Sequence, residues 1–192
     1  MDGQGSPRGG SSIETKFVYL MRGLPSCGKS FTARELAGDR GLVLETDEFF
    51  YTQVGDDPAR FDYRADLLET ARRWTLERFK KAVNAGTTPI VVDRGNGLSL
   101  ESQRYARYAV EHGYHVELKE PRSPWWLEIR SLLDEQPRNE ALLDQWAERL
   151  AQMSRSTHRV PASTIKHRMV KWKCDLTIAD ILSYQVARGS RG

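Results

Sequence analysis

The chain has 192 residues and carries 29 lysine and arginine side chains against 26 aspartate and glutamate side chains, which gives a formal net charge of +3. This length suits one domain, and a content of 39% hydrophobic and 29% charged residues excludes a mostly disordered or collagen-like chain. A net charge of +3 does not by itself indicate nucleic-acid binding. No apolar run approaches the roughly 18–20 residues of a membrane span, and Cys27 and Cys174 lack metal-binding spacing. We therefore expect a cytoplasmic protein with no membrane partner.

Short apolar runs alternate with longer helical patterns along the chain. Residues 1–12 contain four Gly, three Ser and one Pro, so we expect a flexible tail over residues 1–15 and one domain over residues 16–192. The alternation predicts an α/β fold, a three-layer αβα sandwich around a five-stranded, mostly parallel sheet. The expected strands are Phe17–Met21, Leu42–Leu44, Pro89–Val92, His115–Leu118 and Leu176–Ala179, and the expected helices are Lys29–Ala37, Asp62–Ala85, Leu100–His112, Trp125–Leu133, Glu140–Met153 and Ala162–Trp172.

A glycine-rich loop lies between the first expected strand and the first expected helix. Residues 23–30 read GLPSCGKS, which fits the phosphate-loop pattern G-x-x-x-x-G-K-[ST] in its required context. Glycines let successive backbone N–H groups approach phosphate, while Lys29 reaches the β- and γ-phosphates and the Ser30 hydroxyl contributes to Mg²⁺ binding. An accidental turn is disfavoured by the flanking periodicity, and Cys27 reads as a filler rather than a redox group. The residues expected to contact the nucleotide are Gly23, Pro25, Ser26, Cys27, Gly28, Lys29, Ser30 and Phe31.

Carboxylates follow the second and third expected strands. Ligands collect at the carboxyl ends of parallel strands, so these positions are candidates for chemistry. Asp47 is placed to accept a proton from an attacking hydroxyl. Asp93 is placed to orient the Mg²⁺ water shell or an acceptor group, whereas Glu48 is a weaker candidate. The alternative is that each of these residues caps a helix or forms a turn.

The segment from Ser154 to Lys173 contains no acidic residue and six cations. An arginine on a lid segment can stabilise the charge of a transferring phosphoryl group bidentately. Arg155 and Arg159, which lie just before the next expected helix, are the candidates for this role, and we place the lid at about residues 134–161. A solvated helix face is the favoured interpretation for the remaining cations of the segment. These are Lys166, Arg168, Lys171 and Lys173.

Taken in order, the motifs resemble the P-loop kinase family that contains 5′-hydroxyl polynucleotide kinases and NEDD4-binding-protein-2-like proteins. The matching segments are Met21–Ser30, Thr46–Phe50, Ile90–Asp93 with Asn96, and Arg155–Pro161 followed by a basic helix, and the resemblance spans about residues 16–172. It implies a P-loop NTPase fold with a helical lid, ATP and Mg²⁺ held by Lys29 and Ser30, Asp47 as general base, and Arg155 or Arg159 as the lid arginine. The P-loop alone is shared by many unrelated NTPases, so the other three segments carry the specificity.

Three departures from the family pattern affect the acceptor. Phage-type polynucleotide kinases have an arginine three residues after the base, where this chain has Phe50, as the NEDD4-binding-protein-2-like branch also does. The third strand is followed by Asp93, Arg94, Gly95 and Asn96 instead of the usual Asp-Asn/Thr-Thr-Asn. The contacts of the family's two middle residues therefore do not transfer, and we expect Arg94 to supply a cation in their place. About twenty residues near 134–151 look inserted before the lid arginine. The residues expected to contact the acceptor are Asp47, Asp93, Arg94 and Asn96, and those near the metal are Ser30 and Asp93.

These features support an ATP- and Mg²⁺-dependent kinase that phosphorylates a hydroxyl, with a polynucleotide 5′-hydroxyl as the favoured acceptor. One alternative is a kinase for a small-molecule hydroxyl on a sugar, nucleoside or antibiotic, which Phe50 and the modest net charge favour. Another is an interaction module whose ATP-bound state orders the segment from Asp134 to Pro161 for a partner.

Overall fold

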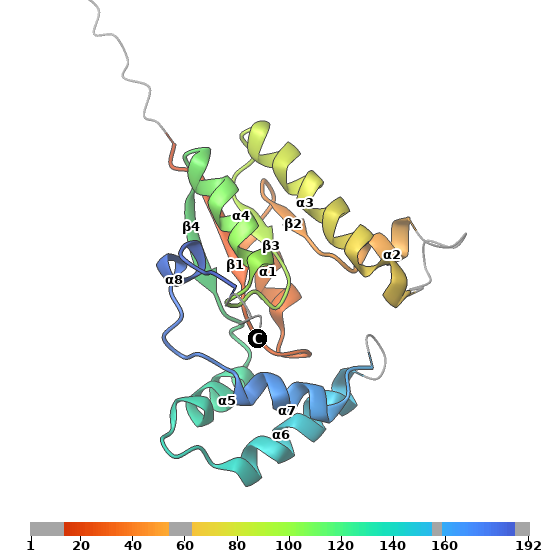
Figure 1. Ribbon diagram of the computed structural model, residues 1–192, viewed down its shortest axis with the longest axis vertical. Coiled ribbons are helices and arrows are strands. Elements are labelled where there is room, and N and C mark those ends of the chain that lie inside the picture. The colour runs from red at the N-terminus through yellow and green to blue at the C-terminus, as the bar shows by residue number, and fades with distance from the viewer. Residues whose placement is uncertain (1–13, 54–62, 155–158, 187–192) are drawn as a thin grey trace, which may run out of the picture.

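Parallel strands form a single sheet in the part of the chain that the computed structural model describes, residues 14–53, 63–154 and 159–186. Within these ranges the sheet has four strands in the order β2-β3-β1-β4 (Figure 1). Val18 of β1 lies opposite Ile90 of β3 and Val116 of β4, and Leu42 of β2 also lies opposite Ile90. All four carboxyl ends therefore point to the same edge. The strands are β1 (Phe17–Met21), β2 (Leu42–Leu44), β3 (Ile90–Val92) and β4 (His115–Lys119).

Helices cover both faces of the sheet, as the predicted sandwich requires. The alternating side chains of β1 show the division: Val18 and Leu20 pack with α3, α4 and α8, whereas Tyr19 and Met21 pack with α1 on the opposite face. Buried parallel strands need such cover on both sides. The bounds are α1 (Lys29–Ala37), α2 (Glu48–Thr52), a 3₁₀ turn (Ala65–Leu67), α3 (Leu68–Asn84), α4 (Leu100–Glu111), α5 (Pro124–Asp134), α6 (Glu140–Met153), α7 (Ala162–Val170) and α8 (Ile178–Leu182).

The prediction of a fifth strand at Leu176–Ala179 is wrong, because this segment enters helix α8. The Thr177 side chain accepts a hydrogen bond from the backbone N–H of Asp180, and the Asp180 carboxylate accepts one from the backbone N–H of Thr177. This reciprocal capping box satisfies backbone donors that a helix start otherwise leaves unpaired. Ile181 packs into the core of the α3–α4 face. Local helix capping thus overrides the β-propensity of the short apolar run.

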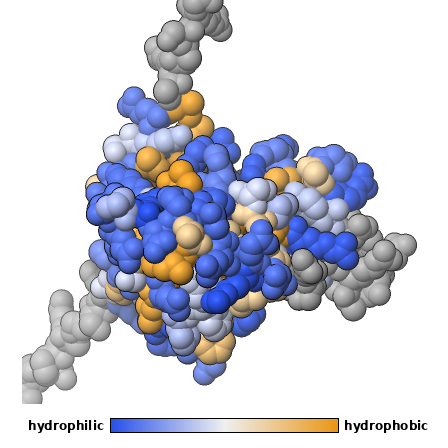
Figure 2. Space-filling view, turned by 90° about the horizontal axis from the view of Figure 1, so that it is seen from below, coloured by the Kyte–Doolittle hydropathy of each residue, from blue (hydrophilic) through white to orange (hydrophobic). Residues whose placement is uncertain are grey.

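Helices α5, α6 and α7 form a separate layer across the carboxyl edge of the sheet (Figure 1). This helical layer has its own apolar core, in which Trp126 and Leu143 are fully buried. Leu24 and Cys27 of the glycine-rich loop belong to the same core. Viewed from the side of this layer, the surface is mostly hydrophilic with small separate apolar patches (Figure 2). No helix of the described residues has the length and apolar content to cross a bilayer.

A buried arginine joins the sheet to the helical layer. Arg22, which directly follows β1, is 5% exposed and stacks over the Trp172 ring at 3.8 Å. Its guanidinium also donates to the backbone carbonyl of Lys173 and lies 3.7 Å from the Glu120 carboxylate. Burial lowers the pKa of Arg22, an effect that Glu120 opposes. These contacts fix the end of α7 against the edge of the sheet where the loop begins.

Candidate active site

The glycine-rich loop has the backbone conformation that its motif predicts. Gly28, at the N-terminal cap of α1, has a φ of 83°, in the left-handed region where a side chain is unfavourable. At Gly23 the constraint is space, because an added Cβ would lie 3.0 Å from Pro121 and 3.3 Å from Lys29. Ser26 also has a positive φ, 58°. The loop therefore presents backbone close to any ligand at the start of α1, where helix N–H groups attract anions.

Lys29 lies at the first position of α1 and folds back over the loop. Its ammonium donates a hydrogen bond of 2.7 Å to the carbonyl oxygen of Leu24. Burial lowers the pKa of Lys29, and the carboxylate of Asp93 is the strongest influence that opposes this. Asp47 acts in the same direction. A cation held between the phosphate loop and two carboxylates is well placed to neutralise phosphate charge.

The two predicted carboxylates meet at the edge of the sheet beside Lys29. Asp93 is 7% exposed, and its backbone N–H donates to the carbonyl of Leu44 at 2.9 Å, which ties the ends of β2 and β3 together. Asp47 is half-buried at the N-terminal cap of α2. Both act electrostatically on Lys29. The structure thus brings together three of the residues that the sequence singles out.

Glu45 is a site residue that the sequence reasoning missed. Its side chain forms a hydrogen bond with Asp93, and burial together with Asp93 raises its pKa to about 7. The charged form of Glu45 is disfavoured because the side chain loses water contacts and lies beside a second carboxylate. The available signal was its place two residues before Asp47 at the end of β2.

This oxygen-rich edge fits Mg²⁺ that arrives with a nucleotide. Among the described residues, no three His, Cys, Asp or Glu side chains converge to form a metal cage. Mg²⁺ characteristically takes one or two protein oxygens and fills its remaining positions with phosphate and water. The Ser30 hydroxyl and the Asp93 and Glu45 carboxyl groups would be the hard oxygen ligands of this kind, and a divalent cation would relieve the crowding of the carboxyl pair.

Arg94 and Asn96 have different surroundings. Arg94 forms an ion pair with Glu101 and interacts electrostatically with Asp47. The amide of buried Asn96 donates to the carbonyls of Met21 at 2.8 Å and Val92 at 3.0 Å. These bonds make Asn96 a brace between the ends of β1 and β3, while Arg94 adds positive charge to the site.

The cations of the basic segment, residues 154–173, fall into two groups: some hold helices together and others lie near the phosphate loop. Lys166 pairs with Glu140 and Asp144, both at 2.7 Å, and so fixes α7 against α6. Arg168 is exposed, in agreement with the predicted solvated face, and its charge also acts on Lys29 and lowers the pKa of that lysine. The sequence signal for this difference is their spacing, because residues two apart on α7 lie on different faces of the helix.

The two predicted lid arginines have less support from the described contacts. Arg155 lies outside the described residues. Arg159 is exposed, and its backbone N–H donates to the carbonyl of Ser154 at 2.9 Å. Among the described residues its guanidinium has no carboxylate within ion-pair distance. Arg168 is therefore the basic-segment cation that the structure places in electrostatic reach of Lys29.

The segment after Asp47 forms an apolar cluster. Phe50 is fully buried and packs against Phe49 and Tyr63, with ring centroids 5.5 and 5.1 Å away. Glu48 forms an ion pair of 2.5 Å with Arg78 of α3. The position where phage-type enzymes have an arginine is thus part of a packed core, and Glu48 has a structural partner.

The phosphate loop itself is tied to α5. Ser123 Oγ donates to the carbonyl of Cys27 at 2.9 Å, and Trp125 Nε1 donates to the carbonyl of Ser26 at 3.0 Å. Burial raises the pKa of Cys27 to about 12, which excludes a reactive thiolate and supports its filler role.

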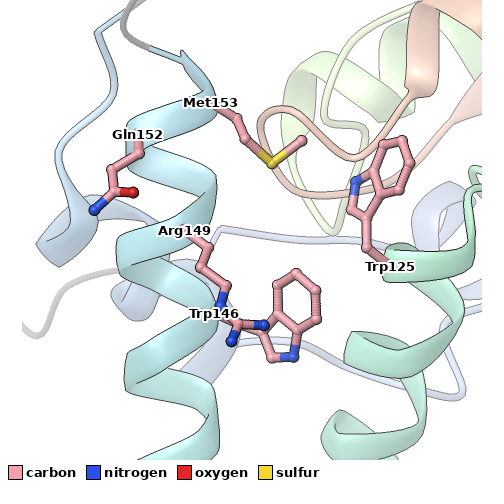
Figure 3. Close-up of a pocket in the computed structure, with 5 residues that line it drawn as sticks. All are labelled: Trp125, Trp146, Arg149, Gln152 and Met153. Atoms are coloured by element: carbon pink, nitrogen blue, oxygen red, sulfur yellow. The ribbon is translucent and has the colours of Figure 1, made fainter.

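An aromatic pocket opens next to these bonds, between α5 and α6. It is a wide, open pocket of about 540 Å³, and Trp125 extends from α5 toward Trp146 and Met153 of α6 (Figure 3). Arg149 lies 5.0 Å from the Trp146 ring centroid. Such a pocket, with ring faces and a polar rim, can stack a flat heterocycle. By contrast, Phe31, another residue expected at the nucleotide, is 65% exposed on α1.

Known proteins with similar sequences cover much of this chain. Human NEDD4-binding protein 2 is 35% identical over 111 residues, which are 57% of this chain and 6% of the relative. Human YLP motif-containing protein 1 is 30% identical over 135 residues, 59% of this chain and again 6% of the relative. The chain thus spans about 6% of the length of these relatives.

A solved structure shares the fold. A chain in the Pnkp1/Rnl/Hen1 RNA repair complex superposes with a TM-score of 0.56 and 15% identity, covering 84% of this chain and 45% of that one. A family model described as an AAA domain, AAA_33, matches residues 18–169. With the phosphate loop, the parallel sheet and the neighbouring carboxylates in place, the chain belongs to this P-loop kinase family, and its core is a nucleotide-binding, kinase-like domain.

Proposed function

We propose that the protein is an ATP- and Mg²⁺-dependent kinase that transfers the γ-phosphate to a hydroxyl group, with the 5′-hydroxyl of a polynucleotide as the favoured acceptor. The observation that carries this proposal is the phosphate loop at the start of α1, at the edge of the sheet where β2 and β3 end in Asp47 and Asp93. The charges of Asp93, Arg168 and Asp47 all act on Lys29 of this loop. These residues come from four separate elements or strand ends, an arrangement that suits phosphoryl transfer. The motif order shared with 5′-hydroxyl kinases and the fold shared with a chain of an RNA repair complex favour a nucleic-acid acceptor.

In the proposed reaction the acceptor oxygen attacks the γ-phosphorus while the bond from this phosphorus to the β–γ bridging oxygen breaks. The acceptor proton passes to the carboxylate of Asp47, and ADP leaves. Lys29 and Arg168 neutralise charge on the phosphoryl oxygens. Ser30, Asp93 and Glu45 would hold Mg²⁺, which would supply further charge neutralisation at the phosphates.

Incubating the protein with γ-labelled ATP and Mg²⁺ tests the acceptor directly. We expect label to appear on 5′-hydroxyl DNA or RNA oligonucleotides and not on oligonucleotides that already carry a 5′-phosphate. The Lys29→Met variant is the control, because it removes the cation at the β- and γ-phosphates and should abolish labelling. No transfer to any hydroxyl compound, with ATP binding intact, would contradict a kinase function.

A small-molecule hydroxyl is the second candidate acceptor. The supporting observation is the burial of Phe50 in an aromatic cluster at the position where an arginine would contact a strand phosphate. In the same labelling experiment, transfer to a sugar, nucleoside or antibiotic but to no oligonucleotide would establish this alternative.

The nucleoside of ATP belongs, in our proposal, at the aromatic pocket between α5 and α6. The strand order β2-β3-β1-β4 puts Asp47 and Asp93 on one side of the phosphate loop and the segment after β4, with Trp125, on the other. A triphosphate whose γ end faces the carboxylates therefore directs its nucleoside toward Trp125.

Tryptophan fluorescence distinguishes this placement from phosphate binding alone. We expect ATP to quench the emission of Trp125 and Trp146 because a purine stacks on the rings, whereas inorganic tripolyphosphate should bind the loop with a much smaller change. The Trp146→Leu variant, which keeps the bond from Trp125 to the Ser26 carbonyl, should weaken ATP binding about tenfold and leave tripolyphosphate binding nearly unchanged. Equal losses for both ligands would place the nucleoside elsewhere.

A further inference from the structure

A second pocket lies between the N-terminal halves of α3 and α4. It encloses about 290 Å³ and is lined by three arginines, Arg72 and Arg73 from α3 and Arg104 from α4. Both helices begin at the carboxyl edge of the sheet, the edge to which Asp47 and Asp93 belong (Figure 1). The pocket therefore lies nearer the carboxyl edge of the sheet than the opposite edge. Its other lining residues are Glu69, Leu76, Leu100, Glu101 and Tyr105.

Arg94 connects this pocket to the proposed general base. It follows β3 directly after Asp93, and its charge interacts with Asp47 as well as with Tyr105 and Arg72, two lining residues of the pocket. Burial lowers the pKa of Arg94, and Tyr105 is the strongest influence that opposes this. Arg94 thus lies between Asp47 and the α3–α4 pocket, and Glu101 of the pocket wall is its ion-pair partner.

The carboxylates of the pocket do not balance its arginines. Glu101 is shared between Arg72, at 3.3 Å, and Arg94. Glu69, which pairs with Arg72, has a side chain that is 74% exposed. Arg73 and Arg104 are exposed, and within the described ranges neither has a carboxylate at ion-pair distance. The pocket therefore keeps an excess of guanidinium groups, which bind phosphate oxygens through paired N–H donors.

We propose that the α3–α4 pocket binds a phosphate of the acceptor strand, the one on the 3′ side of the nucleotide whose 5′-hydroxyl reacts. This inference rests on the proposed kinase function and narrows its acceptor to a phosphate-bearing nucleic-acid strand. Because Phe50 is buried in an aromatic cluster, α2 offers no cation at that position, and the charge for the strand is supplied by α3 and α4 instead. Leu76 and Leu100 add apolar surface for the adjoining sugar.

The test compares two double variants of equal charge change. Arg73→Ala/Arg104→Ala removes two arginines of the pocket, and Arg40→Ala/Lys81→Ala removes two exposed cations that do not line it. We expect the first variant to raise KM for a 5′-hydroxyl, 3′-phosphate nucleotide or oligonucleotide about tenfold or more. Its KM for ATP and its activity on the same nucleoside without a 3′-phosphate should not change. The second variant should behave like the unmodified protein.

Salt dependence and direct binding separate this inference from the proposed function. For a single-stranded oligonucleotide, log of the binding constant falls as log of the salt concentration rises. In the pocket variant this dependence should be less steep, by about 0.7 for each phosphate that it no longer neutralises. If phosphotransfer occurs but wild type and the pocket variant handle acceptors with and without the 3′-phosphate alike, the pocket assignment fails and the kinase function stands. If no transfer occurs, yet oligonucleotide binding disappears in the pocket variant alone, the kinase function fails and the phosphate site stands. Absence of oligonucleotide binding to the wild type overturns the inference.

Discussion

Replacing Asp47 with Asn is expected to lower kcat for phosphotransfer by about 10²–10⁴-fold while the affinity for ATP stays within about twofold of the wild type. The amide keeps the shape of the side chain at the cap of α2 but cannot accept the proton of the attacking hydroxyl. Nucleotide affinity is preserved because the phosphates are held by the loop and Lys29. Measuring kcat with labelled ATP and ATP affinity by calorimetry separates the two effects.

The neighbouring carboxylate is the matched control for this variant. Glu48 is paired with Arg78 of α3 at 2.5 Å, so Glu48→Gln should affect stability slightly and phosphotransfer little. Phosphotransfer that is unchanged in Asp47→Asn, or that falls equally in both variants, would exclude Asp47 as the specific general base.

Replacing Arg168 with Ala is expected to reduce kcat by about 10³-fold or more, the range typical of arginines that stabilise a transferring phosphoryl group. Arg168 is the cation of α7 that acts on Lys29, so its removal leaves charge on the phosphoryl oxygens uncompensated. Arg168→Lys should restore part of the activity, since lysine supplies charge without the bidentate donors. Steady-state kinetics with saturating ATP measure this decrease.

Two other cations of the segment serve as comparisons. Lys171→Ala removes an exposed charge from the end of the same segment and should leave kcat unchanged. Arg159→Ala tests the lid arginine that the sequence favours. A large decrease in Arg159→Ala with wild-type activity in Arg168→Ala would return the role to the position expected from the motif order.

The fold could be predicted largely from the sequence because its signals are local. The β1 run Phe17–Met21 and the helix Glu140–Met153 have the predicted bounds, since periodicity and flanking polar residues specify both ends. Helix α2 was not predicted, because five residues rich in aromatics show no helical period. The segment 176–179 was predicted as a strand for the same reason: a short apolar run does not reveal which partner will pack against it.

Site residues could be predicted from the sequence only where a short local motif fixes their position. Lys29 is placed by the loop and Asp47 by a strand end, and the structure brings both together. Glu45 interacts with Asp93 at the end of the neighbouring strand, and Arg168 acts on the loop from another layer. Both depend on residues distant in sequence, so spacing along the chain could not single them out. The roles of all four residues remain predictions that the variants above test.

Leu24 and Cys27 face away from the ligand side of the phosphate loop and are packed inside the helical layer. The shape of this loop consequently depends on apolar residues about a hundred positions later in the chain, such as Trp126 and Leu143. Substitutions in the apolar core of the helical layer can therefore change the affinity for the nucleotide without changing any residue that contacts it. Natural selection on nucleotide affinity can thus act through the packing of α5 and α6.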